Sequence, residues 1–306
     1  IADDLQSMVI QLDEPLADPA SLNVRYISQL AKKQGIKVLL SGAGGDDLFT
    51  GYRRHYAIEL EQYWSWLPQN IRAKIESYSQ YLNTNNPFQR RLVKLFNGAG
   101  LSNDERLINY FRWTDDRTLK ALFSKDFHEI ILNSNPLNPM IEFIEPISSN
   151  TSRLDKMLLL EQRFFLADHN LNYTDKMSMS EGIEVRVPFL DLELIEFAAR
   201  IPNKYKQNGS QGKWVLKKAM EPFLPKNIIY RSKTGFGVPL RRWLKDDLKE
   251  LLGDLLSVES LNKRGLFSAH SVQQLISDNE SGKIDATYTL FSLLCIEIWC
   301  RAYIDK

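Results

Sequence analysis

A glycine-rich loop followed by two carboxylates is the part of this sequence best suited to chemistry. The loop Ser41–Asp47 reads Ser-Gly-Ala-Gly-Gly-Asp-Asp and directly follows the apolar run Ile36–Leu40. Glycines let a backbone approach phosphate groups closely, and a loop after a strand presents its N–H groups to anions. Asp46 and Asp47 supply the hard oxygen ligands that a divalent cation prefers. The loop therefore predicts a nucleotide or phosphate site; the alternative is a tight turn that Asp caps before a helix.

Two common nucleotide-binding fingerprints do not describe these residues. The loop departs from G-x-G-x-x-G because Asp46 and Asp47 follow Gly45 in place of the last spacing. The segment Gly212–Trp214 departs from the Walker A motif, since it lacks the earlier glycine and the following Ser or Thr. A nucleotide site in this chain would therefore use another kind of loop.

A second loop brings positive charge. Residues Arg231–Pro239 read Arg-Ser-Lys-Thr-Gly-Phe-Gly-Val-Pro, so that Lys233 lies between Ser232 and Thr234. A lysine in a flexible loop can reach a polyphosphate and neutralise charge as it develops on a leaving group. The alternative is a solvated connector with two incidental cations. Because one loop is acidic and the other basic, the pair favours a phosphate site more than either loop does alone.

Other polar groups allow more than one interpretation. The segment Asp13–Pro15 and Asp18 could hold a substrate amine or a metal, or could provide turns and caps before a helix. The histidines, which show no metal-binding spacing, are His55, His128, His169 and His270. We expect His169 to be hydrogen-bonded by its neighbours. Cys295 and Cys300 lie in an apolar stretch, which predicts buried, reduced thiols of a cytosolic protein.

The elements that must position these residues are mostly helices. Apolar spacing predicts a helix over Leu22–Gln34, and the following run Ile36–Leu40 is typical of a strand in a buried parallel sheet. A further helix is expected over Leu154–Leu166. The last expected helices are Leu240–Leu256, Ser268–Ser277 and Asp285–Tyr303. The pattern predicts a helix-dominated α/β chain with one clear parallel strand.

The segment Glu184–Asp191 alternates charged and apolar residues before a helix expected near Leu192. Asp191 is a credible N-cap for that helix, and Arg186 is expected to be a buried ion-pair partner. We interpret this segment as structural support for the loops.

Composition excludes several classes of protein. The 306 residues carry 39 Lys and Arg against 38 Asp and Glu, which argues against nucleic-acid partners and polybasic membrane binding. The 15 Phe, 12 Tyr and 6 Trp argue against disorder. The start shows no signal-peptide pattern, and the run Phe291–Trp299 is broken by Glu297 and too short to span a bilayer. We expect a soluble, cytoplasmic protein without a membrane partner.

Four motifs in the same order make the chain resemble the asparagine synthetase family. They are Ser41–Tyr52, Asp175–Asp191, Gly212–Trp214 and Arg231–Pro239. The match covers the family's C-terminal synthetase domain and none of its N-terminal glutaminase domain. Four ordered motifs are far more specific than a single glycine loop.

The resemblance implies an α/β fold of the ATP-pyrophosphatase type (adenine nucleotide α-hydrolase-like), dominated here by helices. Residues 1–306 would form part of that synthetase domain. Residues 1–60 would be the remnant of its nucleotide-binding α/β part, and residues 61–306 would be its mainly helical part. It implies that ATP activates the β-carboxylate of aspartate as an acyl-adenylate. Ammonia from an N-terminal or separate glutaminase domain would attack this adenylate and give asparagine, AMP and pyrophosphate.

The resemblance also implies roles for individual residues. The expected ATP-binding residues are Leu40, Ser41, Gly42, Gly44 and Gly45. The first three would contact the adenosine part of ATP, largely through the backbone. Asp46 would bind Mg²⁺ on the pyrophosphate, and Lys233 would be the catalytic residue that stabilises charge on the departing pyrophosphate.

Two departures from the family pattern bear on activity. The family's Ser-Gly-Gly-x-Asp-Ser loop, whose Asp is the other metal ligand, is absent from this sequence. We therefore expect these residues alone to bind ATP weakly and to be inactive. Without upstream strands, Ile36–Leu40 would expose an edge, which favours self-association, for example as a homodimer. Ala43 stands where relatives often place Glu, Asp or Tyr, and alanine cannot assist proton transfer.

These departures leave the substrate open. Amidation of a sugar acid or another carboxylate in surface-polysaccharide biosynthesis is one alternative to asparagine formation. A non-catalytic interaction module on the same fold is another.

Overall fold

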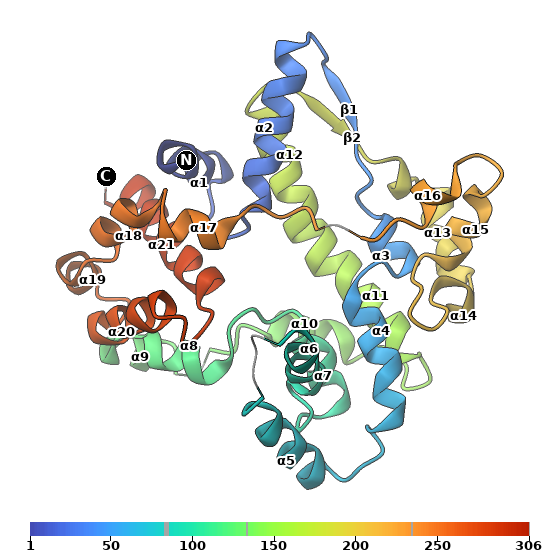
Figure 1. Ribbon diagram of the computed structural model, residues 1–306, viewed down its shortest axis with the longest axis horizontal. Coiled ribbons are helices and arrows are strands. Elements are labelled where there is room, and N and C mark those ends of the chain that lie inside the picture. Colours follow the sequence, from blue (N-terminus) through green and yellow to red (C-terminus); the bar gives the residue numbers. More distant parts are fainter. Residues whose placement is uncertain (83–85, 133, 234, 306) are drawn as a thin grey trace.

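A computed structural model of the chain describes residues 1–82, 86–132, 134–233 and 235–305 (Figure 1). The predicted loop residue Thr234 lies outside this part. Within it, helices dominate, and a small parallel sheet joins two distant segments. The prediction of a helix-dominated α/β chain is confirmed.

The helices and strands follow in this order. The first are Ala2–Leu12 (α1), Ala20–Lys33 (α2), Val38–Leu40 (β1), Gly45–Phe49 (α3), Arg53–Leu60 (α4), Glu61–Tyr63 (η1), Gln69–Ser79 (α5), Pro87–Phe96 (α6) and Asn103–Asn109 (α7). The middle elements are Asp116–Leu122 (α8), Lys125–Ile130 (α9), Asn138–Ile144 (α10), Arg153–Leu160 (α11), Glu161–Leu171 (η2), Asn172–Met179 (α12), Glu184–Arg186 (β2), Pro188–Leu190 (η3) and Leu192–Arg200 (α13). The last are Asn203–Lys206 (α14), Trp214–Met220 (α15), Lys226–Ile229 (α16), Leu240–Lys245 (α17), Lys249–Leu255 (α18), Val258–Arg264 (α19), Ala269–Glu280 (α20) and Thr287–Tyr303 (α21).

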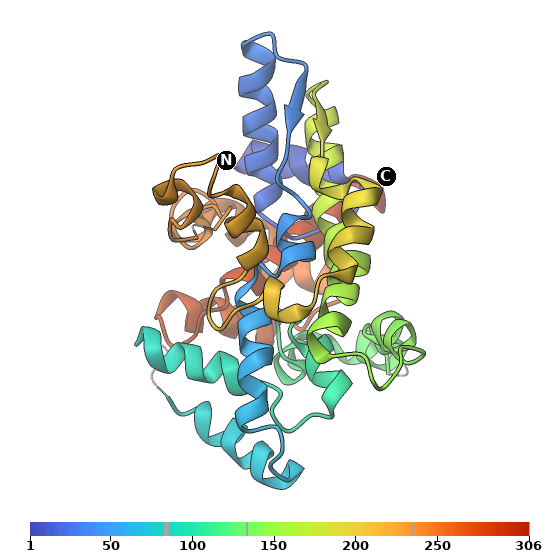
Figure 2. The same cartoon turned by 90° about the vertical axis from the view of Figure 1, so that its right-hand side faces the viewer.

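Two helix–strand pairs build the sheet. Each strand follows a helix, α2 before β1 and α12 before β2, and the two helices pack together. The strands are parallel, with Leu39 opposite Val185. Figures 1 and 2 show that β1, β2 and the adjoining helix ends project from the rest of the molecule.

The predicted burial of the strand is wrong. The strand is shorter than Ile36–Leu40, and the side chains of Ile36 and Leu40 are 46% and 74% exposed. Because the sheet has two strands and projects into solvent, no layer covers its apolar faces within the described residues. An apolar run indicates that burial is favoured, but it does not show which residues provide the cover.

The segment after β2 matches one expectation and corrects another. Asp191 caps α13, as predicted, because its Oδ1 accepts a hydrogen bond of 3.2 Å from the backbone N–H of Leu194. Arg186 is not a buried ion-pair partner. Its side chain is 63% exposed and donates to Glu184 two residues earlier on the same strand.

Two predicted helices are interrupted. The helix expected over Leu154–Leu166 is α11 followed by η2, a π-helix that ends at Leu171. The expected helix Leu240–Leu256 divides into α17 and α18, where the N–H of Leu248 bonds to the carbonyl of Trp243. Hydrophobic spacing locates such segments but does not resolve changes of helical winding, because neighbouring helix types share most of their apolar face.

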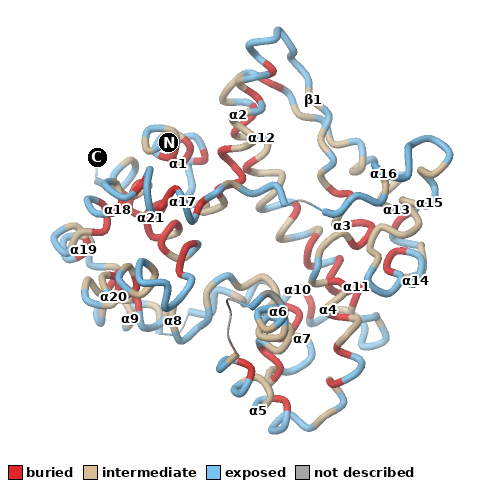
Figure 3. Tube along the Cα trace, in the orientation of Figure 1, coloured by how far each residue is buried: buried red, intermediate tan, exposed pale blue. Residues whose placement is uncertain are grey.

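Three apolar cores hold the helices together (Figure 3). The largest joins α1 and α12 to α17–α21 around the fully buried Phe291. Cys295 and Cys300 are buried free thiols, as predicted. The second core joins α4, α7, α10 and α11. The third anchors α3 through Leu48 and Phe49, and so positions the end of the predicted phosphate loop.

We searched the described helices for a membrane span and found none with the length and apolar character to cross a bilayer.

Candidate functional site

The loop between β1 and α3 is fixed at both ends. The Ser41 N–H donates a hydrogen bond of 2.8 Å to the Arg186 carbonyl, which extends the pairing of the strands by one residue. Gly44 has a φ of +87° at the N-cap of α3, and a Cβ atom there would lie 2.4 Å from Cδ2 of Leu190. Glycine is therefore required at position 44, both for its backbone conformation and for the close approach of Leu190.

Asp46, on the first turn of α3, lies between two lysines. Its Oδ1 is 2.7 Å from Nζ of Lys213 and its Oδ2 is 2.9 Å from Nζ of Lys233. Burial favours the protonated acid, but the two ammonium groups outweigh it and hold the pKa of Asp46 below its ordinary value. Asp46 is therefore ionised at neutral pH, and the trio carries a net charge of one positive unit. We call Asp46, Lys213 and Lys233 the Asp46 cluster.

Glycines allow the segments of the Asp46 cluster to approach. A Cβ atom on Gly51 would lie 1.5 Å from Oδ1 of Asp46, and one on Gly212 would lie 1.9 Å from the Thr50 carbonyl oxygen. The next residue, Lys213, has a φ of +56° and donates its N–H to the Phe49 carbonyl over 2.8 Å. The backbone around Thr50 therefore sets the position of Lys213.

Asp47, the next residue along α3, is 1% exposed. The Tyr52 hydroxyl donates toward its carboxylate, at 3.3 Å from Oδ1 and 3.4 Å from Oδ2. Burial, reinforced by the negative charges of Glu161 and Asp46, raises the pKa of Asp47 to about 7. The two adjacent carboxylates therefore do not form one ligand pair. The ring of Tyr52 links them, since Nζ of Lys233 lies 4.7 Å from its centroid.

The buried carboxylate of Glu161 holds two residues, Arg54 and His55, that lie next to Tyr52. Glu161 is fully buried at the start of η2 and forms an ion pair with Nε of Arg54. Its Oε2 accepts a hydrogen bond of 2.6 Å from Nε2 of His55, which is also fully buried. The Arg54 guanidinium lies 4.3 Å from the Tyr52 ring centroid. These contacts hold the ring of Tyr52 in place.

The donor set around Asp46 fits Mg²⁺ in one mode only. The described residues contain no group of three or more His, Cys, Asp or Glu side chains able to hold a metal by themselves. Mg²⁺ at phosphate sites commonly uses one or two carboxylates together with substrate phosphates and water. Asp46 suits that mode because it is ionised and its side chain is 25% exposed. Asp47 does not, since its carboxyl is buried and partly protonated at neutral pH.

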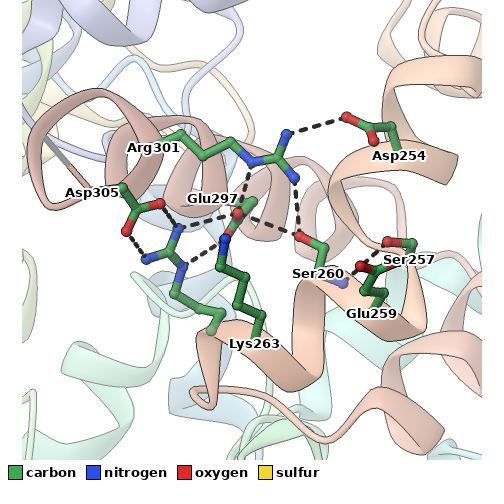
Figure 4. Close-up of a pocket in the computed structure, with 9 residues that line it drawn as sticks. Asp254, Ser257, Glu259, Ser260, Lys263, Glu297, Arg301 and Asp305 are labelled. Atoms are coloured by element: carbon green, nitrogen blue, oxygen red, sulfur yellow. Dashed lines mark hydrogen bonds and ion pairs between the residues drawn. The ribbon is translucent and has the colours of Figure 1, made fainter.

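A cavity of about 540 Å³ lies elsewhere, among α18, α19 and α21 (Figure 4). Its two arginines are matched by acids. Arg264 binds Glu297 over 2.8 Å and Asp305 over 2.6 Å, and Arg301 binds Glu297 over 2.9 Å and Asp254 over 3.2 Å. Because these charges neutralise one another, we interpret the network as a structural tie between the last helices.

A second cavity, of about 420 Å³, has an aromatic lining and is called the aromatic cavity below. Its lining residues are Leu16, Ala17, Phe111, Trp113, Met140, Phe164, Phe165, His169 and Ser292. Contacting rings connect it to the Asp46 cluster: Phe165 meets Tyr52 edge-on at 5.5 Å and stacks on His169 at 5.3 Å, measured between centroids. The expectation that His169 is hydrogen-bonded is confirmed, since its Nε2 lies 2.8 Å from Oδ2 of Asp18.

The acidic segment near the N-terminus is bound internally. Asp13 pairs with Lys176, whose Nζ also donates to the Leu12 carbonyl over 2.8 Å. Oδ1 of Asp18 accepts a hydrogen bond of 2.9 Å from the N–H of Ala20 at the start of α2. The sequence allowed this segment to hold a ligand or to provide turns and caps. The contacts of Asp13 and of Oδ1 of Asp18 agree with the second interpretation.

Some of the predicted site residues meet in the structure, and others are exposed to solvent. Asp46 and Lys233, 187 residues apart, are in direct contact, and the loop Ser41–Gly45 leads straight into Asp46. Leu40 ends β1 with its side chain in solvent, and Gly42 is also exposed. We expected Asp46 to bind Mg²⁺ on the pyrophosphate and Lys233 to stabilise the charge of that pyrophosphate, whereas here the two side chains bind each other.

Sequence reasoning missed two members of this site. Lys213 was noted only within the motif Gly212–Trp214, and Tyr52 only as the end of the first motif. The signal for Lys213 was its glycine neighbour, because a glycine beside a lysine permits a close backbone contact. The sequence contains no comparable signal for Tyr52.

Comparison with known proteins relates the chain to asparagine synthetases. The family model described as asparagine synthase matches residues 1–301. "Asparagine synthetase [glutamine-hydrolyzing] 1" of Bacillus subtilis (strain 168) is 27% identical over 309 residues, which covers 99% of this chain and 46% of that protein. A "putative asparagine synthetase [glutamine-hydrolyzing]" of Mycobacterium tuberculosis (strain ATCC 25618 / H37Rv) is 28% identical over a match that covers 98% of this chain and 44% of that protein. "Amidase chyE" of Penicillium rubens is 23% identical over a match that covers 90% of this chain and 43% of that protein. The chain thus spans less than half the length of the curated relatives that it matches here.

Proposed function

Because the chain belongs to the asparagine synthase family, we propose that it is the synthetase part of an enzyme that forms an amide at the expense of ATP. The observation that carries this proposal is the Asp46 cluster. Two lysines from distant segments meet one ionised carboxylate at the end of a glycine-rich loop. Such a set can bind a polyphosphate through cations and backbone N–H groups. An ATP-pyrophosphatase type of fold is part of the proposal.

In the proposed reaction a substrate carboxylate attacks the α-phosphate of ATP. This forms the acyl-adenylate and releases pyrophosphate with the electron pair of the broken P–O bond. Ammonia then attacks the acyl carbon, loses a proton, and displaces AMP. The incoming ammonia would come from a glutaminase domain or partner, in keeping with the glutamine-hydrolysing names of the relatives.

The loop and the residues of the Asp46 cluster have different roles in this proposed reaction. The N–H of Gly44 lies at the start of α3, where anions are stabilised, while the N–H of Gly45 donates to the Gly42 carbonyl over 3.2 Å. Lys233 has a side chain 53% exposed and can exchange Asp46 for the departing pyrophosphate, whose charge it would neutralise. Lys213 is held by its backbone contact and stays with Asp46. Mg²⁺, when bound with ATP at Asp46, would screen charge between the phosphates.

The carboxylate substrate is proposed as aspartate, which the names of two relatives support. One observation favours a different carboxylate. Ala43 lies in the loop beside Asp46 and has no group that can move a proton. A sugar acid or another carboxylate is therefore the second candidate, on the same scaffold and with the same acyl-adenylate chemistry.

Product analysis of the complete natural protein tests the proposal. It is incubated with ATP, Mg²⁺ and ammonium, and with aspartate or glucuronate in turn. Asparagine and AMP formed in equal amounts support the first substrate, and amidated glucuronate with AMP supports the second. Formation of ADP contradicts the acyl-adenylate chemistry. No consumption of ATP with either carboxylate contradicts the proposal and favours a non-catalytic module.

Substitution of Lys233 tests its assigned role. We predict that Lys233→Ala lowers amide formation by at least about 100-fold, as expected for loss of a group that stabilises charge in the transition state. The free energy of unfolding should change by less than about 1 kcal/mol, because the side chain is 53% exposed and its ion pair is screened. Lys245→Ala, at an exposed position of α17, is the matched control. Unchanged turnover in Lys233→Ala refutes the role.

A further inference from the structure

The aromatic cavity is shaped to hold a small organic molecule. Its volume of about 420 Å³ lies within the usual range for such sites. It is bounded by η2, α10, α21 and the residues between α7 and α8, with Trp113 and Phe165 among its rings. None of its described lining residues is a lysine or arginine. A phosphate, nucleotide or carboxylate would therefore find no cation in this lining.

A negative charge lies against one wall of the cavity. The carboxylate of Asp18 accepts from the Ala20 N–H over 2.9 Å and from Nε2 of His169 over 2.8 Å. Because a carboxylate only accepts hydrogen bonds, the His169 nitrogen is the donor, and the pair keeps the charge of Asp18 when the imidazole is neutral. His169 itself lines the cavity and stacks on Phe165 at an interplanar angle of 10°.

Neighbouring hydroxyls respond to the same charge. Burial and then the charge of Asp18 raise the pKa of both Tyr173 and Tyr288. The ring of Tyr288 meets Trp113 edge-on at 4.9 Å, and the ring of Tyr173 meets His169 edge-on at 5.5 Å. The negative field of Asp18 therefore extends over the wall that these rings form with the cavity.

One cation already lies near the rings. The Arg54 guanidinium is 5.1 Å from the Phe111 centroid and 4.6 Å from the Phe165 centroid. It does not line the cavity, and its charge is matched by the buried Glu161. Arg54 shows that these rings accept a cation on a face, and its guanidinium pairs with Glu161, whereas the Asp18 carboxylate is hydrogen-bonded to His169 and the Ala20 N–H.

We propose that the aromatic cavity binds an organic ammonium compound, with its cation near Trp113 and the Asp18–His169 pair and its apolar part against Leu16 and Met140. Cation–π attraction and the Asp18 charge would act on the same ligand group. The site is separate from the Asp46 cluster, since the Tyr52 and Phe165 rings lie between them. The inference does not depend on the proposed ATP chemistry.

Two probes of similar size and opposite charge test the inference. Phenethylamine and 3-phenylpropionate are titrated into the complete protein by calorimetry at neutral pH. We expect phenethylamine to bind at least about tenfold more tightly, because the cavity supplies negative charge and aromatic faces. Equal or tighter binding of the carboxylate, or no binding of either probe, overturns the inference.

Three variants locate the binding. Asp18→Asn should remove the preference for the amine, and Trp113→Leu should weaken amine binding by about tenfold. Glu259→Gln, in the ion-paired cavity among the last helices, is the control and should leave binding unchanged. If Asp18→Asn does not fold, Trp113→Leu decides, because it removes no buried ion pair. Amine binding that neither cavity variant changes contradicts the assignment. AMP formation, assayed on the same samples, reports separately on the proposed function.

Discussion

Replacement of the buried Asp47 by asparagine is predicted to stabilise the protein at alkaline pH. The pKa of this carboxyl is raised to about 7, from an ordinary value of 3.8, by burial and by the charges of Glu161 and Asp46. A carboxyl whose pKa rises on folding favours the folded state most at low pH. That stability is fully present below about pH 4 and is lost as the pH rises through 7.

The magnitude follows from the size of this shift. Each pKa unit corresponds to about 1.4 kcal/mol, so the raised pKa of Asp47 costs about 4 kcal/mol of stability at pH 8, where the folded protein holds it ionised, and about 2 kcal/mol at pH 5.5, where the folded protein keeps it protonated and the unfolded chain does not. Asparagine has nearly the same shape, carries no charge, and keeps an oxygen that can accept from the Tyr52 hydroxyl. Asp47→Asn should therefore raise the free energy of unfolding by these amounts.

Urea unfolding followed by circular dichroism measures the effect at pH 5.5 and pH 8. Asp247→Asn, at an exposed position between α17 and α18, is the control and should show a small, pH-independent change. The reasoning is refuted if Asp47→Asn destabilises the protein at pH 8, or if its difference from the natural protein is the same at both values.

Two further substitutions test the packing around the Asp46 cluster. Gly212→Ala should lower the free energy of unfolding by about 3 kcal/mol, because the new Cβ would lie 1.9 Å from the Thr50 carbonyl oxygen, and thermal denaturation measures this loss. A variant with an unchanged midpoint would contradict the close approach. Glu161→Ala should cost about 3 to 5 kcal/mol in urea unfolding, since it leaves Arg54 without its buried partner. Glu196→Ala, which removes an exposed ion pair, should cost under about 1 kcal/mol, and equal losses in both variants would refute the contrast.

Part of the candidate site is a local feature of the chain. A strand, a glycine-rich loop and Asp46 follow one another in the chain, so their proximity is a local property that the sequence displays. The proximity of Asp46 and Lys233 is not local, and their approach to one site was expected from the opposite charges of two loops and the family resemblance. Their direct pairing was not expected, because charge complementarity alone does not say whether an anion separates the two side chains.

What the sequence could not supply depends on tertiary contacts. Lys213 joins the Asp46 cluster because Gly212 lets its backbone touch that of Thr50, a contact between segments about 160 residues apart. Asp47 looked equivalent to Asp46, but burial beneath Tyr52 gives it the opposite pKa shift. The strand Ile36–Leu40 has the composition of a buried strand, and its exposure here reflects a sheet of two strands. Periodicity reports which residues favour burial and does not report what covers them.

Isotope transfer tests the central claim most directly. The complete protein is given ATP, Mg²⁺, ammonium and aspartate labelled with ¹⁸O in its β-carboxylate, and the products are analysed by mass spectrometry. An acyl-adenylate requires one carboxylate oxygen to leave with AMP, so the account predicts one ¹⁸O atom in each AMP and unlabelled pyrophosphate. Label in inorganic phosphate together with ADP, or asparagine formed with unlabelled AMP, would contradict it.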